Sequence, residues 1–282
     1  MQEFKDRVAV ITGGASGIGL ALARRFAREG VKLVLADIEE DALRKVEQEF
    51  RKSGVPVLAI RTDVSRGQDV ERLAEKTLAT FGAVHIVCNN AGVAPGGVVW
   101  ESTTADWEWV LGVNVWGVIH GLRVFVPMML RQDTPCHIVN TASVAGLLSV
   151  PGMGIYCVSK HAVVTLSECL YHDLVERKAQ IGVSVLCPAY VPTGIVDSER
   201  NRPALLRNPT RARSPEDIER EEQVRHAVQS GRVSADMVAE MVFDGIRKDQ
   251  FYILTHQRIK PAIAARMEDI LSQRNPRDMS KP

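Results

Sequence analysis

Short apolar segments alternate with amphipathic helical segments along nearly the whole chain, and this alternation constrains the fold more than any other feature. The segments expected to form strands contain few polar residues and cover 7–12, 32–36, 55–60, 84–88, 137–141, 183–187 and 251–254. Strands that are apolar on both faces are typical of a parallel sheet with helices on each side. No linker interrupts the alternation. The sequence therefore predicts a single doubly wound α/β domain of Rossmann type over residues 1–282.

Helical patterns fill the intervals between these strands. A capping box formed by Ser65 and Gln68 predicts the start of one helix, and Phe81-Gly82 predicts its end. Another helix is expected between the glycine-rich segment and Gly30. Further helices are expected over 39–52, 104–131, 154–178, from 234 onward, and beyond 261.

Bulk composition excludes several classes of function. The 282 residues include 35 Lys and Arg against 34 Asp and Glu, a net charge of +1, so no global field attracts nucleic acid or a membrane surface. No apolar run approaches the ~20 residues of a membrane span, and the amino terminus lacks the apolar core of a signal peptide. Of the five cysteines, Cys88 and Cys187 lie in apolar strands and are expected to be buried free thiols. A soluble, cytoplasmic protein is predicted.

Composition changes at about residues 191–232, where prolines and arginines accumulate. A loop of this length in a compact domain is usually functional or disordered. It follows the sixth strand, and ligands bind at the carboxyl ends of such strands. We predict a substrate lid, with a solvated surface insertion as the alternative. Residues 257–282 are expected to form a carboxyl-terminal tail, helical at first and then frayed.

A glycine-rich turn lies between the first strand and its helix, with Gly13, Ser16, Gly17, Ile18 and Gly19 as candidate binding residues. Glycine allows the backbone to approach a pyrophosphate and leaves the N–H groups at the helix start available to bind it. A plain tight turn is the alternative. The preceding strand and the following helix favour a dinucleotide site.

Asp37 closes the second strand about 20 residues beyond this turn, where a carboxylate can accept both hydroxyls of an adenosine ribose. The same carboxylate would repel a 2′-phosphate, and no arginine or lysine occupies Ala15, Ser16 or Ile38 to compensate. The cofactor is therefore predicted to be NAD rather than NADP. The alternative is that Asp37 caps the next helix.

Tyr156 and Lys160 are four residues apart, so on a helix they lie on the same face. Lowering a tyrosine pKa from about 10 to about 7 needs roughly 4 kcal/mol in favour of the phenolate. A lysine charge ~5 Å away at an effective dielectric of ~20 supplies on the order of 3 kcal/mol. The pair predicts a proton-transfer site next to an oxidised dinucleotide. Taken alone, the pair could be a surface pair. Two other polar residues, Ser143 and Asn114, also have plain alternatives: Ser143 could be one of several hydroxyls in a turn, and Asn114 could cap a backbone carbonyl.

Taken together, these motifs resemble the short-chain dehydrogenase/reductase family. The matching motifs are dense over about residues 5–193, and the resemblance continues more loosely to about residue 254. The resemblance rests on Thr12-Gly-x-x-x-Gly-x-Gly19, Asp63-Val64, Asn89-Asn-Ala-Gly92, Asn114, Ser143, Tyr156-x-x-x-Lys160 and 188–193. It implies that Asp63 and Val64 border the adenine, that Asn90, Ala91 and Gly92 pass beneath the cofactor, and that Val191 and Thr193 contact the nicotinamide carboxamide. The family usually has Pro-Gly at Pro188-Ala189, so the local turn is expected to differ here.

The resemblance also implies catalytic roles. Tyr156 would be the general acid or base, Lys160 would lower its pKa and hold the nicotinamide ribose, and Ser143 would bind the substrate oxygen. Asn114 would kink its helix and hold a water that relays protons to Lys160. Family members form homodimers or homotetramers through the helix that includes 161–174 and the helix before it.

The function predicted is an NAD-dependent oxidoreductase that interconverts a secondary alcohol and its ketone. Its small-molecule substrate is expected to be hydrophobic, in a pocket formed by Ser143, Tyr156, Ala145, Met153 and Tyr190. The alternatives are a non-catalytic NAD-binding protein and a sugar-nucleotide epimerase or dehydratase. No His, Cys, Asp or Glu cluster has metal-ligand spacing.

Overall fold

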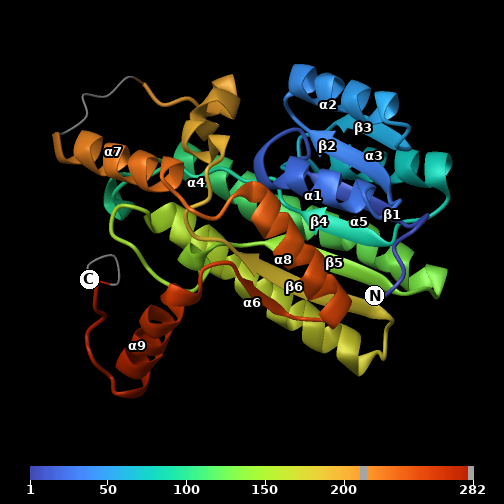
Figure 1. Ribbon diagram of the computed structural model, residues 1–282. Helices are drawn as coiled ribbons and strands as arrows, with labels where there is room; N and C mark the ends of the chain where they lie inside the picture. The colour runs from blue at the N-terminus through green and yellow to red at the C-terminus, as the bar shows by residue number, and fades with distance from the viewer. Residues whose placement is uncertain (210–214, 279–282) are drawn as a thin grey trace.

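The computed structural model describes residues 1–209 and 215–278, and a parallel seven-stranded sheet forms its centre (Figure 1). The strands are ordered β3-β2-β1-β4-β5-β6-β7, and every neighbouring pair is parallel. Their bounds are β1 (Val8–Thr12), β2 (Lys32–Asp37), β3 (Val57–Arg61), β4 (Ile86–Asn89), β5 (Cys136–Thr141), β6 (Ile181–Cys187) and β7 (Tyr252–Leu254). The predicted doubly wound, single-domain fold is confirmed.

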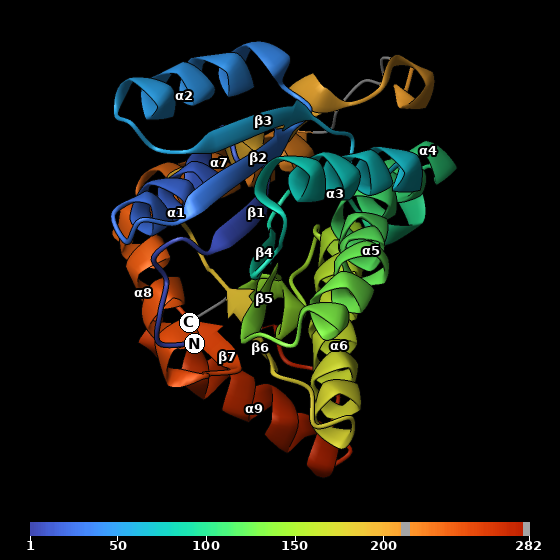
Figure 2. The same cartoon turned by 90° about the vertical axis from the view of Figure 1, so that its right-hand side faces the viewer.

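Helices cover both faces of the sheet, which explains why β1, β4 and β5 are buried along their whole length (Figure 2). One layer comprises α1 (Gly17–Ala27), α2 (Glu40–Lys52) and α8 (Ala235–Lys248). The other comprises α3 (Gly67–Phe81), α5 (Gly117–Gln132) and α6 (Gly154–Glu176). Phe26 and Phe243 lie at the centre of the first layer, and Leu73 and Phe125 at the centre of the second.

The order of the strands determines where a ligand can bind. The chain runs outward through β1, β2 and β3, then crosses back so that β4 pairs with the other side of β1. The two connections leave the sheet in opposite directions at the carboxyl ends of β1 and β4, which opens a crevice between them. The predicted cofactor motifs from Gly13 to Gly92 lie at this edge, on loops, at the start of α1 or at the end of β2.

A single long helix contains α4 (Thr104–Leu111), a π-helical turn η2 (Gly112–Trp116) and α5. This 29-residue helix has a stretch with a mean hydropathy of 1.4, sufficient by length and composition alone to cross a membrane. The expectation that no segment has this length was therefore too strict, because it considered only uninterrupted apolar runs. Here α5 packs against α3 and the sheet, as the core helix of a soluble domain does.

The capping box predicted at Ser65 and Gln68 is wrong. The residue before α3 is Arg66, and the Ser65 hydroxyl donates instead to Asp63 Oδ1 at 2.6 Å. Because α3 begins at Gly67, Arg66 and not Ser65 occupies the capping position, so Ser65 lies one residue too early for its Oγ to accept an N–H of the first turn. A capping box does form at α4, between Thr103 and Asp106. The end of α3 at Gly82, with φ 76°, is as predicted.

The segment after β6 contains more regular structure than a loop. It forms the 3-10 helices η4 (Gly194–Asn201) and η5 (Ala204–Leu206) and then α7 (Pro215–Gln229). Residues 210–214 of the predicted lid and 279–282 of the predicted tail lie outside the described residues. The tail contains η6 (Gln257–Ile259) and α9 (Lys260–Leu271).

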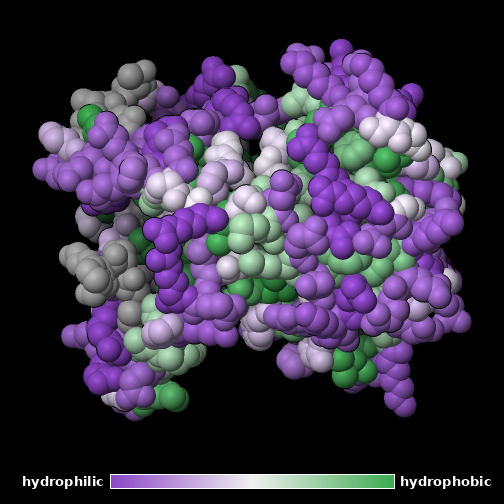
Figure 3. Space-filling model, viewed as in Figure 1, coloured by the Kyte–Doolittle hydropathy of each residue, from purple (hydrophilic) through white to green (hydrophobic). Residues whose placement is uncertain are grey.

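Charged side chains make the outer faces of α2 and α7 largely hydrophilic (Figure 3).

Two further expectations concern exposure. All five cysteines are free, and Cys88 and Cys187 are buried as predicted, whereas Cys169 is exposed. Residues 161–174 are predicted to carry an apolar stripe for a subunit contact, formed by Ala162, Val163, Leu166, Leu170 and Leu174. Val163 and Leu174 are buried in the protomer's own core, and the other three are half-buried. The exposed apolar residues of α6 are Val158, Tyr171 and Val175.

One buried histidine makes the stability of this fold dependent on pH. His85 Nδ1 accepts the Val8 N–H at 3.1 Å, which requires an unprotonated ring nitrogen. Burial, followed by the charges of Arg7 and Lys32, lowers the pKa of His85 to about 4. The unfolded chain binds this proton at higher pH than the folded chain, so stability falls as pH decreases from the unfolded value toward the folded one.

We expect this group to remove about 2 kcal/mol of unfolding free energy at about pH 5, relative to neutral pH. Urea unfolding at the two pH values measures the loss. His85→Asn keeps an acceptor for the Val8 N–H but does not titrate, so its loss should be smaller by that amount. Equal losses in the two proteins would show that His85 is not the source.

Candidate active site

The glycine-rich turn places backbone N–H groups at the mouth of the crevice. Gly17 has φ 51°, a conformation that favours glycine, and it begins α1. Ser16 precedes the helix but makes no side-chain capping bond, so the first N–H groups of α1 are not capped by that side chain. A Cβ at Gly19 would lie 2.0 Å from Gly13 O. Gly19 therefore allows the turn to fold tightly, while Gly13 and Gly17 face the crevice.

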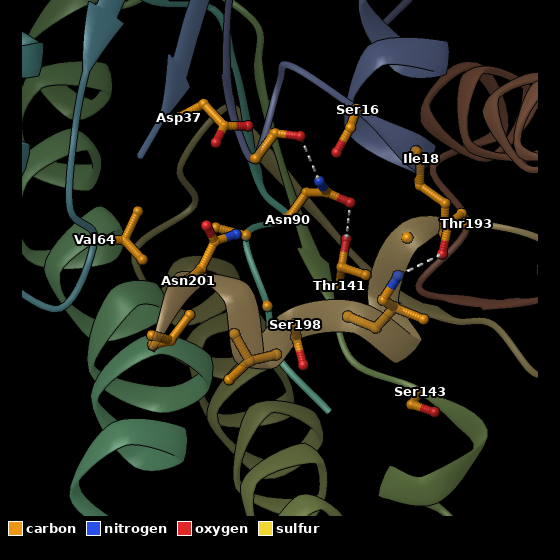
Figure 4. A pocket seen from close by; sticks show the side chains of 18 of the residues that line it. Ser16, Ile18, Asp37, Val64, Asn90, Thr141, Ser143, Thr193, Ser198 and Asn201 are labelled. Carbon is orange, nitrogen blue, oxygen red and sulfur yellow. Dashed lines mark hydrogen bonds between the residues drawn. The ribbon is translucent and has the colours of Figure 1, made fainter. Parts of the chain in front are cut away.

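Asn90 ties three strand ends together below this turn (Figure 4). Its Nδ2 donates to Thr12 O at 3.0 Å, and its backbone N donates to Thr12 Oγ1 at 2.9 Å. The Thr141 hydroxyl donates to Asn90 Oδ1 at 3.4 Å. These bonds join the carboxyl ends of β1, β4 and β5 and form a rigid floor.

Asp37 lies at the carboxyl end of β2, with both carboxylate oxygens held by backbone donors. Ala15 N donates to Oδ2 at 3.0 Å, and Glu39 N donates to Oδ1 at 3.0 Å. Burial raises the pKa of Asp37 above its ordinary value, while these N–H groups lower it. The bond from Glu39 N resembles a cap, but Glu39 itself precedes α2. Asp37 therefore links the glycine-rich turn to the end of β2 and faces the crevice.

Asn114 lies in the π-helical turn and is fully buried. Its Oδ1 accepts Val93 N at 2.8 Å, and its Nδ2 donates to Val93 O at 2.9 Å and to Ser159 Oγ at 3.0 Å. The extra residue of the π turn directs this side chain at the loop after β4. Asn114 thus clamps the Val93 loop to α6 and does not line the crevice itself.

Ser143, Tyr156 and Lys160 meet on the wall opposite Asp37. Ser143 follows β5, and its Oγ accepts Ala145 N at 3.1 Å and donates to Pro188 O at 3.3 Å. Lys160 is buried, and its Nζ donates to Thr141 O at 2.9 Å. Nζ lies 5.7 Å from the centre of the Tyr156 ring. The i and i+4 positions on α6 bring the two side chains together, as the sequence predicts.

Burial dominates the ionisation of this group of residues. It raises the pKa of Tyr156 to about 12, with the side-chain interaction with Ser143 acting in the opposite direction. Burial also lowers the pKa of Lys160 to about 8, with Cys187 acting in the opposite direction. Without a cofactor, the pKa of Tyr156 is therefore raised rather than lowered as the sequence suggests, because burial disfavours the phenolate.

Most of the residues selected from the sequence line one crevice: Gly13, Ser16, Gly17, Ile18, Asp37, Asp63, Val64, Asn90, Ala91, Gly92, Ser143, Tyr156, Lys160, Val191 and Thr193. Five others do not line it: Gly19, Asn114, Ala145, Met153 and Tyr190. Ala145 is buried, whereas Tyr190 is 51% exposed. Ala189 lines the crevice and is not among the residues with positive φ, so the substitution for glycine causes no strain there.

The outer wall of the crevice belongs in part to the predicted lid, but its residues were not predicted individually as site residues. Ser198, Arg200 and Asn201 of η4 line it, together with Glu39. Ser198 Oγ accepts Ala94 N at 3.1 Å, and Figure 4 shows the ribbon from Thr193 to Asn201 passing across the crevice. The available signal was position, because η4 begins directly after Thr193 in the segment that follows β6.

The residues present fit a dinucleotide. The start of α1 and the glycine-rich turn suit a pyrophosphate, and the carboxylate of Asp37 suits a ribose diol. Val64 lines the crevice at the same end as Asp37 and suits an adenine.

Comparisons with known proteins agree with this geometry. A family model described as short chain dehydrogenase matches residues 7–204. The chain belongs to the short-chain dehydrogenase family. The CLA biosynthesis dehydrogenase/reductase of Lactiplantibacillus plantarum is 35% identical over 278 residues, which cover 98% of this chain and 97% of that protein. The 1-deoxy-11-beta-hydroxypentalenate dehydrogenase of Streptomyces exfoliatus is 35% identical over 269 residues, 95% of this chain and 89% of that protein.

A solved structure supports the cofactor. The crystal structure of a short chain dehydrogenase/reductase from Burkholderia phymatum in complex with NAD is 53% identical, with a TM-score of 0.96 and 99% of each chain covered. This short-chain dehydrogenase is therefore an oxidoreductase that uses NAD, as the sequence predicts. Its fold is that of a soluble enzyme.

The Asn114 clamp can be tested through stability. Asn114→Ala removes three buried hydrogen bonds and leaves Val93 N and O without partners, so we expect a loss of about 3 kcal/mol in unfolding free energy. Ser159→Ala removes one of the three bonds and should cost about 1 kcal/mol. Urea unfolding measures both, and equal losses would contradict the clamp.

Proposed function

We propose that this enzyme interconverts a secondary alcohol and its ketone, with Tyr156 as general acid and base. The observation that supports this most is the arrangement of Ser143, Tyr156 and Lys160 on one wall of the crevice whose other end contains the glycine-rich turn and Asp37. A substrate oxygen at this wall meets a hydroxyl donor and a phenol at once.

In the oxidation direction, the Ser143 hydroxyl donates a hydrogen bond to the alcohol oxygen and stabilises the charge that develops on it. Tyr156 takes the hydroxyl proton as the carbonyl forms, and gives it back in the reduction direction. Lys160 contributes a fixed charge behind the phenol. NAD, when bound, supplies the hydride acceptor and a positive charge next to the phenol.

An apolar substrate suits the crevice, because its lining includes the apolar residues Val93, Trp109, Val113, Ile195 and Val228. Ala145, Met153 and Tyr190 remain proposed substrate contacts from the sequence, although none lines the crevice. The name of one relative, 1-deoxy-11-beta-hydroxypentalenate dehydrogenase, agrees with a hydroxyl-bearing organic substrate. We therefore propose a hydrophobic secondary alcohol.

Two alternatives receive less support. A sugar-nucleotide epimerase or dehydratase needs a larger substrate domain, whereas relatives of the same length and named as dehydrogenases match 95% or more of this chain. A non-catalytic NAD-binding protein has no need for Asn114, Ser143, Tyr156 and Lys160 together. Assays of NADH formation with a panel of hydrophobic secondary alcohols separate the possibilities. NAD binding without any turnover would favour the non-catalytic alternative.

Three features of organisation complete the proposal. Residues 191–232 act as the substrate lid on the single domain 1–282, because η4 already passes across the crevice. The enzyme works in the cytoplasm as a homodimer or homotetramer. The subunit contact would use α6, where the exposed apolar residues Val158, Tyr171 and Val175 lie in addition to the half-buried part of the predicted stripe.

Tyr156→Phe removes only the hydroxyl, so we expect kcat to fall by about a thousandfold while NADH affinity stays within about twofold. Stopped-flow NADH formation and NADH fluorescence titration measure the two quantities. Tyr171→Phe, an exposed tyrosine on the same helix, is the matched control and should change neither. Turnover that survives in Tyr156→Phe would exclude the proton-transfer role.

A further inference from the structure

We propose that Glu39 is a second determinant of the preference for NAD over NADP, because it holds the Arg200 guanidinium in an ion pair at the adenosine end of the crevice. Without Glu39, Arg200 would be available to bind a 2′-phosphate. The inference rests on the proposed role of Asp37 as the acceptor of the adenosine ribose.

The contact between Glu39 and η4 is specific. Arg200 NH2 lies 2.6 Å from Glu39 Oε1, and Asn201 Nδ2 donates to the same oxygen at 2.9 Å. The other end of the Arg200 fork, NH1, donates to Gly194 O and to Asp197 O, each at 2.9 Å. The guanidinium is therefore fixed from both sides, although its side chain remains 41% exposed.

This ion pair lies beside the residue that selects the ribose. Glu39 N donates to Asp37 Oδ1 at 3.0 Å, so the two acidic residues are anchored to each other. Asp37, Glu39, Arg200 and Asn201 all line the crevice. In Figure 4, Asn201 lies on the Asp37 and Val64 side, whereas Thr193 lies beside Ile18. Because Glu39 contacts both Asp37 and Arg200, we expect the Arg200 guanidinium to be able to reach a phosphate on a ribose that Asp37 binds.

Glu39 is ionised at neutral pH. Burial raises the pKa of its carboxyl, but hydrogen bonds from Arg200 and Asn201 and the charge of Arg200 together lower it below the ordinary value. The pair with Arg200 is therefore neutral as a unit. The only uncompensated charge that these three side chains contribute to this end is that of Asp37, which repels a 2′-phosphate.

Simple charge counting predicts opposite effects for the two partners. Glu39→Gln leaves Arg200 unpaired and adds a positive charge, which attracts a 2′-phosphate. Arg200→Gln leaves Glu39 unpaired and adds a negative charge, which repels it. The double variant is neutral again. We expect the ratio of NADPH to NADH affinity to rise about tenfold in Glu39→Gln, fall about tenfold in Arg200→Gln, and return to near the wild-type ratio in the double variant.

A purely mechanical role would give a different pattern. The same contacts fasten η4 across the crevice, and if that were their only effect, all three variants would weaken NADH and NADPH by equal factors. The affinity ratio therefore separates the electrostatic effect from loss of closure.

The experiment measures Kd for NADH and for NADPH by nucleotide fluorescence, with calorimetry as a second measurement, in the wild type and the three variants. Glu40→Gln is the matched control, because Glu40 is the next residue and pairs with Arg44 along α2. Its affinity ratio should not change. Circular dichroism melts verify that each variant is folded.

The inference would be overturned if the NADPH to NADH affinity ratio moved in the same direction in Glu39→Gln and Arg200→Gln, or did not move in either. Tight NADH binding in that case would leave the proposed function intact. A wild-type protein that bound neither dinucleotide would remove the proposed function and this inference with it. Opposite shifts of the affinity ratio in the two single variants, cancelling in the double variant, would support both the proposed function and this inference.

Discussion

The parallel pairing of β1 with β4 is the constraint on which the rest of the molecule depends. Because the two strands point the same way, their following loops meet at one edge of the sheet. Asn90 then bonds to Thr12 and Thr141 and fixes that edge as a floor. Every group with a proposed role, from Asp37 to Lys160, is positioned relative to this floor. A binding crevice follows from strand order, and its chemistry from the few side chains at the strand ends.

Burial makes the proposed catalytic groups responsive to the cofactor. Desolvation disfavours the charged forms of both Tyr156 and Lys160, so the protein alone holds the tyrosine protonated. Low dielectric also strengthens any charge brought into the crevice. A positive nicotinamide therefore has a larger effect on this phenol than it would have on an exposed one. In the proposed mechanism, Tyr156 would therefore act as a base only when the cofactor is bound.

Local sequence signals were sufficient for the fold and for most of the crevice. Apolar strands, the glycine-rich turn, Asp37 and the Tyr156 to Lys160 spacing all encode their structure within a few residues. Contacts between distant segments were not accessible in this way. The bond network of Asn114 with Val93 and Ser159, and the pairing of Glu39 with Arg200, join residues far apart in the chain. The inward orientation of Val163 likewise depends on what α6 packs against, which periodicity alone cannot specify.

The central claim is that the Tyr156 phenol becomes a base through the charge of the bound cofactor. The most direct test is an ultraviolet titration of phenolate absorbance in the wild type and in Tyr156→Phe, each with and without NAD. The difference between the two proteins isolates Tyr156. The account predicts a pKa near 12 without NAD and a value several units lower with NAD bound. A Tyr156 signal that titrates at the same pH in both conditions would contradict it.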